Sequence, residues 1–224
     1  MRYIFKHIFF LILVTLVTNN LKAQENELPV ENEIIKEVLG DLDKDSIDEK
    51  VVVCNIHKID VTNLASDRVL YIYKKIDSSW VLWNKSYEAI LSSNEGGIYG
   101  DPFEDIEINS GILYIYHRGG SSWKWSYTDK YRYQNNTFEL IGISEEGGKN
   151  CEYWLKTDYN ISTGKIIIIK EYEKCIDDMH FSNKTKKEIF YHKLKKKITL
   201  KDRRDKQPKI VSPRFKFDIY ISNQ

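Results

Sequence analysis

The feature that most constrains the fold is a succession of short β-branched and aromatic runs after position 50, each bounded by turn residues. Asn109-Ser110-Gly111 and Ser162-Thr163-Gly164 separate two of the clearest pairs of runs, as hairpin turns do. Aromatic residues make up 13% of the chain, which also favours sheet over helix. We therefore expect an all-β, antiparallel meander that forms a sandwich-like or barrel-like domain. The expected strands are 51–56, 69–73, 80–83, 106–108, 112–116, 123–133, 138–143, 153–159, 165–172, 189–194, 198–200 and a final one within 215–220.

One short helix is expected before the first of these strands. Asn32 is a favourable N-cap, and Gly40 is a typical helix end. Between them, residues 33–39 place Ile34, Ile35, Val38 and Leu39 on one face at helical spacing.

The N-terminus predicts export. Residues 1–23 combine a basic start, an apolar run and Leu21-Lys22-Ala23, the pattern of a cleaved signal peptide, with a retained anchor as the alternative. We expect 24–31 to be a disordered linker and 32–224 a single β-rich domain with a basic C-terminal segment. After cleavage no other stretch is long enough to cross a bilayer. The expected location is secreted or periplasmic.

An acidic stretch precedes the strand at 51–56. Asp41, Asp43 and Asp45 recur every second residue, Ile47 offers a carbonyl at the seventh position and Glu49 stands at the ninth. Ca²⁺ takes six to eight oxygen ligands, and loops supply them at such offsets. The spacing predicts a calcium site, with a solvated acidic turn as the alternative.

The stretch resembles the Asp-x-Asp-x-Asp-Gly-x-x-Asp calcium loops of FG-GAP and VCBS-type repeats in secreted bacterial proteins, which lead into a strand. Ser46 stands where that pattern has Gly, and Glu49 where it has Asp. An EF-hand fits less well, because Val52 occupies its twelfth position and cannot supply a carboxylate. The loop occurs once, which argues against a propeller of such repeats.

A second stretch alternates in character. Aromatic residues at odd positions share one face of a strand, and Lys124, Ser126 and Thr128 lie on the other. The face is either core or an exposed platform for sugar rings or peptide, and nothing in the spacing selects sugar. The segment around it is similar to those of secreted bacterial proteins that carry an upstream acidic loop, which implies no activity. The platform residues are Trp123, Trp125, Tyr127 and Tyr131.

Catalytic motifs are missing from the sequence, and the histidines stand singly. Asp101, Glu104 and Asp105, in an acid-rich region from Glu95 to Glu107, are the only acid–base candidates that we single out. The preferred function is a secreted, non-enzymatic binding or structural domain with one calcium-stabilised loop. The alternative is a secreted hydrolase acting on glycan or peptide through these carboxylates.

Cysteines and charge complete the expectations. Cys151 and Cys175 flank the hairpin at Gly164 almost symmetrically, so a disulfide between them is predicted, with Cys54 as a buried free thiol. Lysines gather toward the C-terminus, where they protect an edge strand or attach the protein to an anionic surface. With 34 basic and 33 acidic residues, the chain is not expected to bind nucleic acid. A cell-envelope glycan or another exported protein is the candidate partner.

Overall fold

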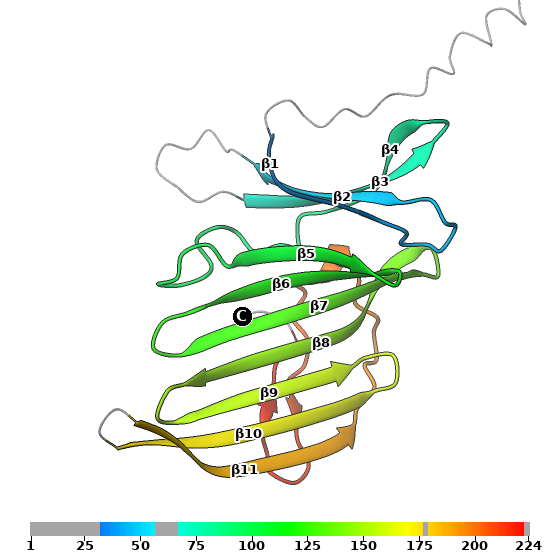
Figure 1. Ribbon diagram of the computed structural model, residues 1–224. Helices are drawn as coiled ribbons and strands as arrows, with labels where there is room; N and C mark the ends of the chain where they lie inside the picture. The colour runs from blue at the N-terminus through cyan, green and yellow to red at the C-terminus, as the bar shows by residue number, and fades with distance from the viewer. Residues whose placement is uncertain (1–31, 57–66, 177–178, 222–224) are drawn as a thin grey trace, which may run out of the picture.

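The computed structural model describes residues 32–56, 67–176 and 179–221 (Figure 1). The predicted signal peptide and linker, 1–31, lie outside the described residues. Within the described part, no helix is long and apolar enough to span a bilayer.

Two antiparallel meanders make up most of the described part of the chain, and neither closes into a barrel there. In each, strands that follow one another in sequence are neighbours in the sheet, so the all-β antiparallel prediction is confirmed. The first sheet contains β1 (Asn32–Gly40), β2 (Glu49–Ile56), β3 (Asp67–Ile76) and β4 (Ser79–Ser86). The second contains β5 (Phe103–Asn109), β6 (Ile112–Gly120), β7 (Lys124–Gln134), β8 (Thr137–Lys149), β9 (Tyr153–Asn160), β10 (Lys165–Ile176) and β11 (Met179–Tyr191).

The helix expected at 33–39 is wrong, because this segment is strand β1, paired with β2. A bulge between Ile34 and Lys36 breaks the strand's alternation. As a result Ile35 and Val38, three residues apart, both pack on the core, while Leu39 is 55% exposed. A bulged strand thus imitates helical spacing.

One hydrophobic core joins the two sheets. Val53 and Ile72 from the first sheet and Ile115 from the second belong to the same buried cluster. Trp83 of β4 reaches across to the second sheet, where its ring centroid lies 4.3 Å from that of Tyr133 and 5.0 Å from that of Phe138. The first sheet lies at the β5 end of the second (Figure 1).

The C-terminal segment, 192–221, crosses one face of the seven-stranded sheet (Figure 1) and buries Ile198 and Ile219 in the shared core. The strand expected at 198–200 is wrong: Thr199 makes an isolated bridge and caps the short helix η2 (Leu200–Asp202). The final strand is only β13 (Asp218–Ile219), paired with β12 (Ile210–Val211). We call the core-facing side of the large sheet its inner face.

Lysines mark the edge strand β11. It is the last strand of the seven-stranded sheet, and Lys184 and Lys187 on it are exposed. Charged side chains on an edge oppose pairing with another sheet, so this placement fits the protective role.

Candidate functional site

The acidic loop is the turn between β1 and β2, and its backbone is wound around Asp41. The N–H groups of Lys44 and Ser46 both donate to the Asp41 carboxylate, and the Ile47 N–H donates to Asp45 Oδ1 at 2.8 Å. Lys44 and Ser46 adopt left-handed conformations, with φ of 69° and 70°. Ser46 therefore holds a left-handed conformation, which glycine adopts without steric cost.

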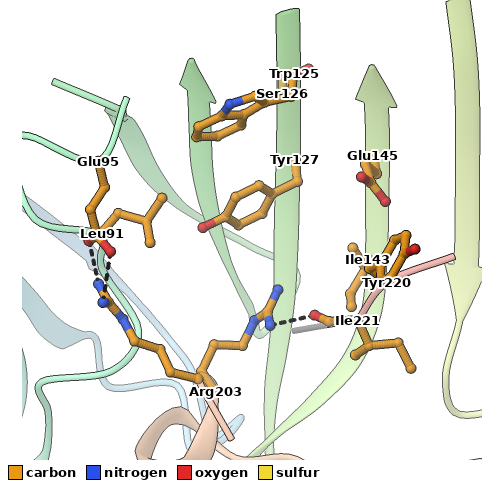
Figure 2. Close-up of a pocket in the computed structure, with 11 residues that line it drawn as sticks. Leu91, Glu95, Trp125, Ser126, Tyr127, Ile143, Glu145, Arg203, Tyr220 and Ile221 are labelled. Carbon is orange, nitrogen blue, oxygen red and sulfur yellow. Dashed lines mark hydrogen bonds and ion pairs between the residues drawn. The ribbon is translucent and has the colours of Figure 1, made fainter. Parts of the chain in front are cut away.

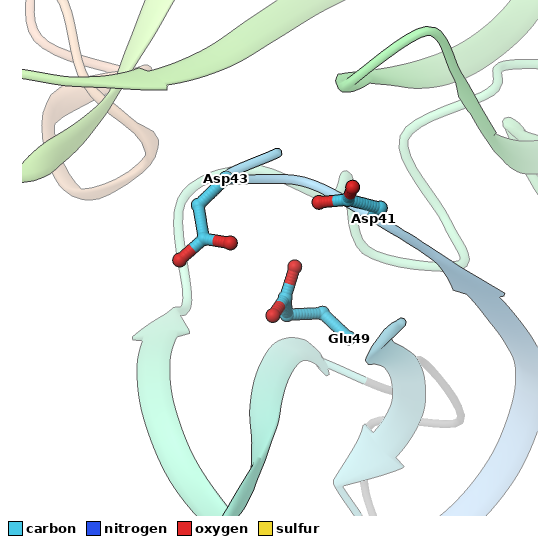
Figure 3. Close-up of side chains that lie close together, drawn as sticks. All are labelled: Asp41, Asp43 and Glu49. Atoms are coloured by element: carbon cyan, nitrogen blue, oxygen red, sulfur yellow. The ribbon is translucent and has the colours of Figure 1, made fainter. Parts of the chain in front are cut away.

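Three carboxylates converge inside this turn, those of Asp41, Asp43 and Glu49 (Figure 3). One oxygen from each lies within 4.8 Å of the others. Glu49, the first residue of β2, is fully buried, and its Oε2 accepts a hydrogen bond from the Leu42 N–H at 2.8 Å. Glu49 Oε1 and Asp43 Oδ1 are buried and have no hydrogen-bond partner among the described residues.

A lysine of the neighbouring strand faces the cluster. Lys74 of β3 is hydrogen-bonded to Asp43, and its Nζ lies 3.6 Å from Asp45 Oδ2 and 4.0 Å from Glu49 Oε1. The same ammonium stands 4.7 Å from the ring centroid of Trp83. Its hydrogen bond to Asp43 raises the pKa of Lys74. One ammonium from β3 therefore faces the carboxylates of Asp43, Asp45 and Glu49.

Burial sets the electrostatics of Glu49. Desolvation raises the pKa of this carboxyl, and the charge of Asp43 adds to the effect. The Leu42 hydrogen bond and Lys74 act in the opposite direction but are outweighed. A buried carboxylate in this state gains from any further cation that reaches Oε1.

The structure gathers three of the five predicted ligands, Asp41, Asp43 and Glu49. The Asp45 carboxylate lies outside this group, on Lys74 and the Ile47 N–H, and the Ile47 side chain is half exposed. Lys74 was missed from the sequence. The sequence does place Lys74 two positions after the apolar Ile72, and therefore on the same face of a strand. That this face meets the acidic turn follows only from the register of β3 against β2.

The predicted aromatic platform divides into three parts. Tyr131 is fully buried in the core, and Trp123 is exposed and packs on Tyr153 with centroids 5.2 Å apart. Trp125 and Tyr127 line a cavity of about 370 Å³ between the inner face and the C-terminal segment (Figure 2). The four residues thus form no common platform.

Three distant segments form this cavity, which we call the inner pocket. β7 and β8 contribute Tyr127 and Glu145, which are paired across the strands. The connection after β4 contributes Glu95, and the C-terminal segment contributes Arg203 and Tyr220 (Figure 2). No sequence motif marked this pocket, because its walls come from separate segments of the chain, of which Glu95 and Arg203 are 108 positions apart.

The carboxylates proposed for a hydrolase are held by basic residues. Asp101 pairs with Arg68, Glu104 with Arg118 at 2.6 Å and Asp105 with Lys36 at 2.7 Å. Arg68 is buried and Asp101 half exposed, whereas the other two pairs are at the surface. Each of the three carboxylates thus has a basic partner.

His117 is the buried histidine of the inner face. Its Nε2 accepts a hydrogen bond from the Leu91 N–H at 3.3 Å, and its ring stacks on Tyr127. Burial, reinforced by the charges of Arg203, Arg68 and Arg204, lowers the pKa of His117 to about 3. The imidazole is therefore neutral at physiological pH.

The cysteines are arranged as the sequence predicts. Cys151 and Cys175 form a disulfide that connects the turn before β9 to β10. Cys54 is free and buried in β2, and burial raises the pKa of its thiol to about 11. An un-ionised, inaccessible thiol is a poor nucleophile.

Comparison of the chain with protein-family models, with curated proteins and with solved structures found no match. The assignment of a function therefore depends on the geometry of the two sites themselves.

Proposed function

We propose that this protein is an exported, non-enzymatic binding or structural domain whose β1–β2 turn is stabilised by calcium. The observation that carries the proposal is Glu49. Its Oε1 is buried, has no hydrogen-bond donor among the described residues and faces Asp41 and Asp43. A buried carboxylate oxygen without a donor costs free energy, and a metal ion removes that cost.

Calcium suits the turn better than magnesium does. Ca²⁺ accepts six to eight oxygens in flexible arrangements, whereas Mg²⁺ requires a near-ideal octahedron and keeps most of its water. Asp41, Asp43 and Glu49 would hold the ion, with the Asp45 carboxylate and the Ile47 carbonyl completing the set.

Lys74 has a definite role in this proposal. Its ammonium neutralises part of the turn in the metal-free protein, through Asp43, Asp45 and Glu49. A divalent ion among the same carboxylates repels it. We infer that calcium displaces the ammonium toward solvent, which its side chain, already 25% exposed, can reach.

Two observations support export. The first 23 residues carry the signal-peptide pattern, and the disulfide between Cys151 and Cys175 is typical of proteins from oxidising compartments. Calcium sites of extracellular modules have dissociation constants of about 10⁻⁴–10⁻³ M, and we expect an affinity in this range here.

The test is thermal unfolding of the purified protein in EDTA, in millimolar Mg²⁺ and in millimolar Ca²⁺. We expect a rise of several degrees that is specific to calcium, because a ligand that binds only the folded state stabilises it by mass action. The rise should vanish in the Asp41→Asn, Glu49→Gln double variant. Asp48→Asn removes a charge from an exposed position of the same turn and should keep the rise. Equal melting in all three solutions would mean that the turn is an ordinary acidic one.

A further inference from the structure

The inner pocket has a charge pattern that selects its ligand. Arg203 donates to both oxygens of buried Asp129 and, through Nη1, to the Ile221 carbonyl at 2.6 Å. Arg204 makes two hydrogen bonds to Glu95, of 3.0 and 2.7 Å, and a third to the Ile90 carbonyl. Both guanidinium groups are thus neutralised by partners in the protein.

Glu145 is the carboxylate that remains. It lies on β8 opposite Tyr127, and no described residue donates a hydrogen bond to its side chain. Desolvation raises its pKa, Arg203 opposes the effect and Asp129 adds to it. With Asp129–Arg203 and Glu95–Arg204 paired, the pocket holds one uncompensated negative charge.

The walls beside Glu145 are aromatic. Trp125 and Tyr127 stack with ring centroids 5.8 Å apart and planes 19° from parallel. Tyr220, which belongs to the C-terminal segment, also lines the pocket. Gly147, which faces Trp125 across the strands, has no side chain to fill the space. Aromatic rings attract an organic cation, most strongly where water is excluded.

We propose that the inner pocket binds a small organic cation, an ammonium or guanidinium group on an apolar or aromatic body, with Glu145 as its counter-ion. The charged end lies between Glu145 and the rings of Trp125 and Tyr127. The body of the ligand lies on Leu91, Ile143 and Ile221, which form the apolar part of the lining. A cavity of about 370 Å³ is at the lower end of the range for ligand sites and suits a molecule of this size.

Other ligand classes fit less well. An anion would have to compete with Asp129 and Glu95 for guanidinium groups that are already bidentate partners. A neutral sugar could stack on Trp125 but would leave the charge of Glu145 uncompensated. The proposal does not depend on the calcium site, because Glu145 and Glu49 lie in different sheets.

The experiment is titration of the full protein with a matched series: benzylamine, its neutral isostere benzyl alcohol, the anion benzoate, and glucose. Binding is followed by calorimetry and by the indole N–H resonances, in EDTA so that the metal site takes no part. We expect benzylamine to bind about tenfold more tightly than benzyl alcohol, and benzoate and glucose not to bind. A preference for benzoate or glucose, or equal affinity for amine and alcohol, would overturn the proposal.

Glu145→Gln keeps the size of the side chain and removes its charge. We expect this variant to lose the roughly tenfold preference for the amine while its affinity for benzyl alcohol is unchanged. Glu146→Gln is the matched control, because Glu146 is the next residue along the strand and pairs with Lys156 on the opposite face. An unchanged preference in Glu145→Gln, or an equal loss in Glu146→Gln, would contradict the assignment.

Proton release gives a readout that packing alone does not produce. A cation beside Glu145 lowers the raised pKa of this carboxyl, so benzylamine should release protons as it binds below neutral pH. Calorimetry in two buffers of different ionisation enthalpy measures this release. The wild-type protein should show it and Glu145→Gln should not; the same release from both would refute a role for Glu145.

Discussion

The acidic turn and the inner pocket each contain a carboxyl whose pKa burial raises, Glu49 in one and Glu145 in the other. Glu49 has a backbone donor, a lysine at 4.0 Å and two further carboxylates beside it. Glu145 has aromatic neighbours instead, and the guanidinium of Arg203, whose charge acts on it, is paired with Asp129. The same problem, a desolvated negative charge, thus occurs in two different surroundings.

We infer that the groups around each carboxylate select the kind of cation that binds to it. Several oxygens at short range favour a hard divalent ion, which replaces its hydration shell with carboxylates. A single carboxylate flanked by rings cannot supply that many oxygens, but it suits a weakly hydrated organic cation. The difference teaches that the neighbours of a buried acid, more than its own pKa, identify the ligand.

The largest change in the free energy of unfolding should come from removing the guanidinium of Arg203. Arg203→Met leaves Asp129, which is fully buried, without a counter-charge, and we expect a loss of about 3–5 kcal/mol in the free energy of unfolding. Urea denaturation measures it. Arg204→Met is the control: Arg204 is 31% exposed and pairs with Glu95, so the loss should be about 1 kcal/mol or less. Similar losses for the two variants would contradict the difference in burial.

Glu49→Gln should change the stability of the protein in opposite directions, relative to the wild type, without calcium and with it. In EDTA near neutral pH the variant should be at least as stable as the wild type, because Gln removes a desolvated charge yet can still accept the Leu42 hydrogen bond. In calcium at a hundred times its Kd, the wild type should gain about 2.7 kcal/mol that the variant lacks. Thermal melts in both solutions show whether the order of stability of wild type and variant reverses. The same order in both solutions would contradict the proposed calcium site.

Lys74→Met separates the turn's own cation from the metal. Without metal the variant should lose about 1 kcal/mol, since a partly exposed ion pair is removed. Its calcium affinity should rise about tenfold, because the ion no longer competes with an ammonium. Calorimetric titration with CaCl₂ measures the affinity, and Lys44→Met, an exposed lysine of the same turn, is the control. A lower affinity in Lys74→Met would show that the lysine supports the site.

Much of the fold could be predicted from the sequence because it is made of local hairpins. Turn residues such as Ser110 and Gly164 and the runs beside them specify neighbouring strands in chain order, and the symmetric placement of Cys151 and Cys175 specified the disulfide. The segment of β1 predicts a helix because Ile35 and Val38 are three residues apart and apolar, as on one face of a helix. In the structure the bulge adds one residue to the strand, which breaks the two-residue alternation and turns both side chains to the core.

The sites were only partly predictable, for a related reason. The winding of the turn around Asp41 is local and follows from the spacing of the aspartates. Lys74 and Arg203 act on residues 31 and 74 positions away, so their partners follow from strand register and from the path of the C-terminal segment. Neither is encoded in a short motif.

The pH dependence of stability sharpens the comparison on the pocket side. A folded-state pKa raised above the unfolded value of about 4.5 contributes stability that is complete below that value and is lost as the pH rises through the folded pKa. The contribution of Glu145 should therefore be lost from about pH 4.5 upward, so the stability of the wild type relative to Glu145→Gln should fall over that range. The difference should be below about 1 kcal/mol, since Glu145 is partly exposed. Urea denaturation from pH 4 to 8 measures it, with Glu146→Gln expected to follow the wild type.

Ser46→Gly tests the turn by its backbone alone and should have the smallest effect. Ser46 holds a φ of 70°, which glycine adopts without strain, so we expect a gain of roughly 0.5 kcal/mol and somewhat tighter calcium binding. Ser110→Gly is the matched control, since Ser110 has a φ of 54° in the hairpin between β5 and β6. It should gain similar stability in EDTA and leave the calcium-dependent shift unchanged. An equal change in the calcium-dependent rise of the melting temperature in both variants would show general stabilisation. The backbone strain at Ser46 would then have no connection with calcium binding.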